Sequence, residues 1–209
     1  MFGWLRKPAS ETQVTHGQRL WLYVFAGITM VLLVTPTLIV IPMSFSESQY
    51  LEFPPKNWST RWYEHYFSSP EWMLATVTSL KAAFLTMLVA TPIGVVAAYG
   101  LHASKVKFIR IAFVLLITPM MVPVVLVAIG AFYAYVKLGI LYTLTGLVLA
   151  HTILALPLVL IVTGSALKSY DMNQELAARS LGAPRWKAFL TITLPQIRFA
   201  VVTSALLSF

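Results

Sequence analysis

Residues 175–195 read ELAARSLGAPRWKAFLTITLP, a polar and basic stretch that lies between long apolar runs. Alanine, leucine, arginine and lysine all favour helix, so the stretch is helix-capable. A membrane protein seldom keeps a folded insert of this size between two spans unless another molecule docks on it. The insert therefore indicates a partner outside the bilayer rather than a lone pore.

The composition places the rest of the chain in a bilayer. Of 209 residues, 58% are hydrophobic and 11% are charged, whereas a soluble domain carries roughly 25% charged residues. There are no cysteines, which excludes disulfides, thiolate metal sites and a cysteine nucleophile. The net charge of +8 is spread over several loops, so nucleic acid is not expected as a partner. No catalytic, metal or cofactor residues are predicted.

The apolar runs predict an all-α, polytopic membrane helical bundle. A spanning helix needs ~20 apolar residues, and runs at about 20–44, 73–100, 109–136 and 141–165 satisfy this. A fifth run, 197–209, is incomplete, which predicts a fragment of a longer protein, truncated before its last helices. Ala90, Gly94 and Ala98 recur every four residues and favour close helix packing. Prolines within the runs, such as Pro123, predict kinks.

The basic residues predict the orientation, because Lys and Arg concentrate on the cytoplasmic side. Eleven of them lie in the tail 1–19, in the loop after the second run or after the fourth run, and three lie on the opposite side. The eleven are Arg6, Lys7, Arg19, Lys105, Lys107, Arg110, Lys168, Arg179, Arg185, Lys187 and Arg198. The three are Lys56, Arg61 and Lys137. The N-terminus and the segment 168–195 are therefore expected in the cytoplasm. The aromatic-rich loop 45–72 is then external, either as an interfacial belt or as a docking surface.

The energy for any uphill transport must come from another subunit. The chain has no GxxxxGK phosphate loop, and all seven acidic residues lie outside the apolar runs, which disfavours ion-coupled carriers. At mid-membrane depth, the ionisable candidates are Lys81 and His151. Each residue has two interpretations. Lys81 either extends its amine outward to the membrane surface or lines a translocation path. His151 either forms a hydrogen bond to a neighbouring helix or lines the same path.

The insert is expected to form two short helices separated by a glycine turn. Residues 172–181 form the first helix, and Gly182 takes the left-handed position that ends it. Pro184 begins the second helix, which closes at Leu194 and Pro195. Such an insert can dock in a groove of another protein or lie on anionic lipid, and the residues alone do not choose between these.

The register of this segment resembles the EAA loop of inner-membrane permease subunits of bacterial ABC importers. That pattern is Glu-Ala-Ala, three residues, Gly, nine residues and Ile-x-Leu-Pro. The residues in register, with Arg179 and Ala183 between them, are Ala177, Ala178, Gly182, Ile192, Leu194 and Pro195. Leu176 stands where the family has Glu, and Glu175 lies on another side of the helix. Segments such as Trp58-Ser59-Thr60-Arg61-Trp62 resemble the spermidine/putrescine-type branch.

The resemblance implies a non-catalytic transport subunit with a MetI-like transmembrane domain over 20–209, in a bacterial inner membrane. It further implies cytoplasmic ABC ATPases bound at the loop 168–195, a second permease subunit and a periplasmic solute-binding protein. A polyamine-like solute is favoured. The alternatives are a secondary carrier or channel subunit and a lipid-binding membrane scaffold.

Overall fold

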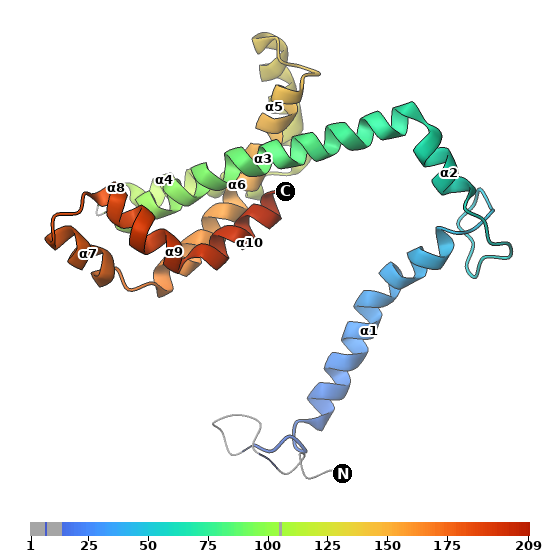
Figure 1. Cartoon of the computed structure of the whole chain (residues 1–209), viewed down its shortest axis with the longest axis horizontal. Coiled ribbons are helices and arrows are strands. Elements are labelled where there is room, and N and C mark those ends of the chain that lie inside the picture. Colours follow the sequence, from blue (N-terminus) through green and yellow to red (C-terminus); the bar gives the residue numbers. More distant parts are fainter. Residues whose placement is uncertain (1–6, 8–13, 105) are drawn as a thin grey trace. The chain divides into compact units, whose positions relative to one another are not determined.

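A computed structural model describes residues 7, 14–104 and 106–209 (Figure 1). Of the residues used to predict orientation, Arg6 and Lys105 lie outside this part, as does most of the tail 1–19. The described residues form helices and no β-strand, and Ser46 and Trp58 pair in an isolated bridge. The fold is therefore all-α. Internal contacts divide the chain into two units, Met1–Met73 and Leu74–Phe209.

The first unit contains α1 (Leu20–Met43) and α2 (Arg61–Ser68), joined by an irregular loop. Backbone bonds fasten the loop at its base, because the Ser59 N–H donates to the Phe45 carbonyl over 2.7 Å and the Glu47 N–H donates to Asn57 over 3.2 Å. The Ser44 and Tyr63 hydroxyls lie 2.7 Å apart. The loop and α2 line a hollow of about 560 Å³ with mostly apolar walls.

The second unit holds the remaining helices and the insert. It comprises most of α3 (Pro70–Ala103), followed by α4 (Ile109–Met121), α5 (Val124–Leu138), α6 (Leu144–Ser169), α7 (Asn173–Ser180), α8 (Arg185–Ala188), the π-helical turn η2 (Phe189–Thr193), α9 (Leu194–Gln196) and α10 (Arg198–Ser208). Among described residues, α1, α3 and α6 are single helices long and apolar enough to cross a membrane.

Helices α3 and α6 approach closely where the small residues recur. Ala90 and Ala98 are buried, and a Cβ added to Gly94 would lie 2.5 Å from Val159 Cγ1. Only glycine fits at that crossing. The predicted close approach is confirmed at Gly94, whose partner is Val159 of α6, and Ala90 and Ala98 are buried on the same face of α3.

The run 109–136 is not the single continuous span that we predicted. It breaks between α4 and α5, whose axes differ by 101°. Val122 at the break is extended, with φ −85° and ψ 136°, because the ring of Pro123 disfavours helical backbone in the preceding residue. The pair is a broken span or a re-entrant hairpin. Pro36, Pro92 and Pro157, by contrast, lie inside helices that continue through them.

The buried contacts of α10 are made partly by hydroxyl groups. Thr163 Oγ1 of α6 lies 3.3 Å from Ser204 Oγ, and Thr91 Oγ1 of α3 lies 3.0 Å from Ser208 Oγ. Each Ser also donates to a carbonyl within α10. Such small polar residues allow close packing while their hydrogen bonds are satisfied inside the bundle.

Candidate functional site

The insert begins directly after α6 and turns on Gly182. Helix α7 ends in a Schellman motif: the Gly182 N–H donates to the Arg179 carbonyl over 3.0 Å and the Ala183 N–H donates to the Ala178 carbonyl over 3.1 Å. Gly182 has φ +93°, which a residue with a Cβ adopts only at a cost. The predicted glycine turn is confirmed, although α7 is shorter than the expected 172–181.

The second half of the insert departs from the expected single α-helix. Helix α8 runs into the π-helical turn η2 and then into α9, and α10 follows at 81°. Leu194 and Pro195 do not close the helical segment, because proline tolerates the first turn of a helix and Pro195 occupies that position in α9. The bend follows at Ile197, whose side chain is buried in the core.

The residues of the family pattern divide into an outward group and an inward group. Leu176 is 49% exposed, and Ala177, Arg179 and Gly182 are also exposed. Leu181 between them is 90% exposed. Ala178, Ala183, Ile192 and Leu194 are half-buried, and Leu194 packs on the core. The exposed members thus give α7 and its turn a free apolar and basic surface, while the others hold the insert in place.

A buried carboxylate lies under this surface, and the sequence did not predict it. Glu175 of α7 is 1% exposed. The Tyr99 hydroxyl of α3 donates to Glu175 Oε1 over 2.5 Å, and Thr193 Oγ1 donates to Oε2 over 2.6 Å. Burying a carboxylate is costly unless its oxygens are hydrogen-bonded, and here both oxygens have a donor.

Arg185 and Phe189 complete the surroundings of Tyr99. The Arg185 Nε–H donates to the Tyr99 hydroxyl over 3.1 Å, and its guanidinium carbon lies 5.3 Å from the Tyr99 ring centroid. The Phe189 ring packs on Tyr99 with centroids 4.4 Å apart. Tyr99 therefore receives one hydrogen bond and donates another, so α8, α3 and α7 are connected through a single hydroxyl. We define Glu175, Tyr99, Thr193 and Arg185 as the carboxylate cluster.

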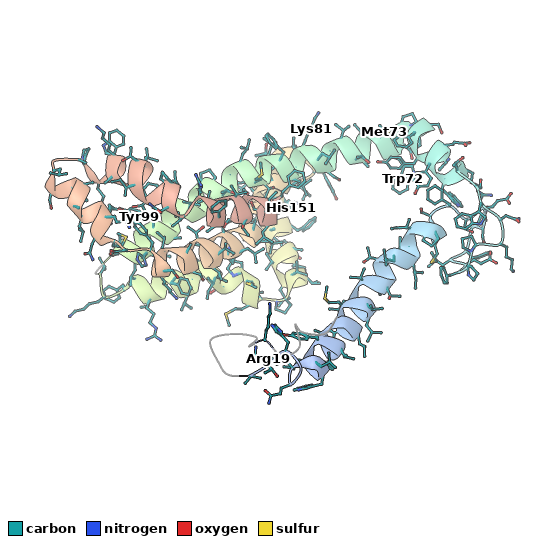
Figure 2. All side chains as sticks on the ribbon, turned by 60° about the horizontal axis from the view of Figure 1, so that its bottom comes forward. Arg19, Trp72, Met73, Lys81, Tyr99 and His151 are labelled. Carbon is teal, nitrogen blue, oxygen red and sulfur yellow. The ribbon has the colours of Figure 1, made fainter. Side chains whose placement is uncertain are left out.

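The carboxylate cluster covers the end of an apolar core built from three parts of the chain. Val95, Ala98 and Tyr99 come from α3, Leu160 and Leu167 from α6, and Phe189 and Ile197 from the insert. Figure 2 labels Tyr99 near the end of α3, beside the insert. The insert is thus folded against the helices and is not a free loop.

Lys81 and His151 lie outside this cluster, on α3 and α6 respectively (Figure 2). Both are exposed on the isolated chain. The structure does not bring either residue to the insert, and it gives no contact between the two among the residues described. Their role as path residues stays a prediction.

Known proteins similar to this chain are transport permeases. Residues 90–209 match the family described as binding-protein-dependent transport system inner membrane component. The spermidine/putrescine transport system permease protein PotC of Haemophilus influenzae is 29% identical over 185 residues, covering 88% of this chain and 72% of the relative. PotC of Escherichia coli K12 is 29% identical, covering 83% and 66%.

Two further similarities widen the comparison. The molybdenum transport system permease protein ModB of Escherichia coli K12 is 30% identical over 155 residues, covering 68% of this chain and 67% of the relative. A crystal structure of a bacterial ABC transporter involved in the import of the acidic polysaccharide alginate matches 97% of this chain and 72% of that one, with a TM-score of 0.69 at 18% identity. That structure shares the fold. The chain therefore belongs to the family of binding-protein-dependent transport system inner membrane components, the MetI-like permeases of ABC importers.

Proposed function

We propose that this chain forms half of the translocation path of an ATP-driven importer and receives a cytoplasmic ABC ATPase on the segment 168–195. The observation that carries the proposal is the outward surface of α7, where Leu176 and Leu181 are exposed beside Arg179. Exposed apolar side chains rimmed by polar groups are typical of protein interaction sites.

The orientation and the partners follow from the same proposal. The tail 1–19 and the insert lie in the cytoplasm, while the loop 45–72 faces a periplasmic solute-binding protein. A second permease subunit supplies the other half of the path. Fusing a periplasm-sensitive reporter after residue 19 and after residue 60 tests the orientation: the second fusion alone should be active.

The ATPase contact is tested by co-purification from detergent. The permease, co-expressed with a candidate ABC ATPase from the same organism, should retain the ATPase, and deleting 175–188 should release it. A point variant sharpens the test. Leu181→Glu places a charge on a side chain that is 90% exposed, so it should weaken docking and leave the permease folded. Leu138→Glu, at an exposed end of α5, is the matched control. If the ATPase stays bound to the variant that lacks 175–188, the proposal is refuted.

For the substrate, we propose a polyamine-like cation. The two relatives named for spermidine and putrescine cover 88% and 83% of this chain, whereas ModB covers 68%. An oxyanion is the second candidate, because ModB matches at 30% identity. Uptake of labelled spermidine and of labelled molybdate, measured in cells that carry the complete transporter, separates the two. Dependence of the uptake on ATP distinguishes an ABC importer of either solute from a secondary carrier. If cells that lack this chain take up the solute at an unchanged rate, the alternative of a lipid-binding membrane scaffold is favoured.

A further inference from the structure

We propose that Glu175 is a positioning residue, which fastens the insert to α3 so that movement of α7 is passed to that helix. The proposal deepens the coupling function above and rests on it. Tyr99 and Thr193 are the residues through which Glu175 acts. None of the three faces the outward surface of α7.

The first step is the connectivity of the chain. Helix α7 is joined through short segments to α6 before it and to α8 after it. Helix α3 is far away in sequence, since Tyr99 precedes Glu175 by 76 residues. The covalent chain therefore transmits a displacement of α7 to α6 and α10, and both of these helices pack on α3. Direct transmission from α7 to α3 requires a side-chain contact between the two. The Tyr99–Glu175 hydrogen bond is such a contact.

The second step is the strength and direction of that contact. Glu175 accepts two hydroxyl hydrogen bonds at 2.5 and 2.6 Å, one from α3 and one from η2. Hydrogen bonds to a charged group are about twice as strong as neutral ones. Because the carboxylate is 1% exposed, water cannot take the place of a lost donor. A carboxylate held in this way resists both sliding and rotation of α7 over α3.

The third step is the choice of residue types. A carboxylate offers acceptors at both oxygens, which suits two hydroxyl donors. Glutamine would keep one acceptor and turn an N–H₂ group towards the other hydroxyl, whose proton must then point elsewhere. The Tyr99 hydroxyl also accepts from Arg185, so its proton is directed at Glu175. The donor order runs from Arg185 through Tyr99 to Glu175.

The fourth step concerns Thr193 in the π-helical turn. Thr193 is fully buried, and η2 interrupts the helical segment that leads from the insert to α10. Single π-helical turns are frequent at functional sites. The Glu175–Thr193 bond therefore fixes α7 to the point where the insert joins its last helix. Glu175 thus contacts two of the routes by which movement can leave the insert, the one through α3 and the one towards α10.

The test uses the complete transporter reconstituted in vesicles with its binding protein. Glu175→Gln removes one acceptor, and Tyr99→Phe removes the α3 hydroxyl while keeping the ring that packs on Phe189. Tyr135→Phe in α5 is the matched control, because it makes the same change at a tyrosine whose hydroxyl has no hydrogen-bond partner among the described residues. Three quantities are measured: bound ATPase, ATP turnover, and solute taken up per ATP.

We expect both variants to retain the ATPase and to hydrolyse ATP, with the uptake per ATP lowered at least about fivefold, the lower end of typical coupling between sites. The double variant should be little worse than either single one, since both break one bond. Tyr135→Phe should match wild type. If Glu175→Gln does not fold, Tyr99→Phe decides the outcome.

Two outcomes overturn the proposal in different ways. An unchanged uptake per ATP in Tyr99→Phe would show that the bond does not transmit movement, and the coupling function would stand. Loss of bound ATPase from both Glu175→Gln and Tyr99→Phe would show that the carboxylate cluster only supports the fold of the docking surface. If wild type itself binds no ATPase, the coupling function fails and this proposal fails with it.

Discussion

Replacing Gly94 by alanine tests whether α3 and α6 meet as closely as the structure requires. The added Cβ would lie 2.5 Å from Val159 Cγ1 and 2.7 Å from Val159 Cβ, about 1 Å closer than the ~3.5 Å at which carbon atoms attract best. Val159 is fully buried, and a β-branched residue in a helix has one strongly preferred rotamer. It therefore cannot turn away. Overpacking of this kind costs about 1–3 kcal/mol.

The assay is thermal unfolding of the purified protein in detergent. A loss of 1 kcal/mol lowers Tm by roughly 2–4 °C for a chain of this length, so Gly94→Ala should unfold several degrees earlier. Gly164→Ala in α6 is the matched control, because its Cβ would have no atom within 4 Å. It should unfold at the wild-type temperature or slightly above, since alanine favours helix more than glycine does.

A second variant separates the steric effect from other causes. Val159→Ala alone should destabilise by leaving a cavity, whereas Gly94→Ala with Val159→Ala should cost less than the sum of the two changes, because the new methyl group fills the vacated space. Equal unfolding temperatures for Gly94→Ala and Gly164→Ala would refute the packing of α3 on α6.

Three further outcomes are expected. Gly182→Ala should lower the free energy of unfolding by roughly 1 kcal/mol, because of its positive φ alone, since the added Cβ would meet no atom within 4 Å. Thermal unfolding measures this loss, and an unchanged unfolding temperature would contradict the Schellman turn. His151→Ala should lower solute uptake while ATP turnover persists, if the residue lies on the path, and unchanged uptake would assign it to packing. Lys81→Met should leave uptake and stability unchanged if its amine only snorkels; a large loss of uptake would place it on the path.

Local signals in the sequence were sufficient for the turn and for the packing stripe. Gly182 ends α7 because a short-range rule governs helix C-termini, and a four-residue spacing of small side chains marks the face on which α3 meets α6. Both features depend on neighbours within one helix. Neither requires knowledge of which segments meet in space.

The carboxylate cluster needed information that no local pattern contains. Glu175 stands in a basic insert, and its two donors come from Tyr99, 76 residues earlier, and Thr193, 18 residues later. The one signal that the sequence contains for Glu175 is that it is a lone acidic residue beside the basic part of the insert. A kink was predicted at Pro123, but not that the helix would break there into α4 and α5. Six prolines lie in the apolar runs, and whether a helix continues through one depends on its neighbours.

The central claim is that the outward face of α7 docks an ATPase, and single-cysteine cross-linking tests it most directly. The chain has no cysteine, so Leu181→Cys and Leu138→Cys each create a unique exposed thiol for a photoreactive label. With the complete transporter in membranes, the label on residue 181 should form an adduct with the ATPase, and the label on residue 138 should not. Absence of an adduct at 181, or equal adducts at both positions, would contradict the account.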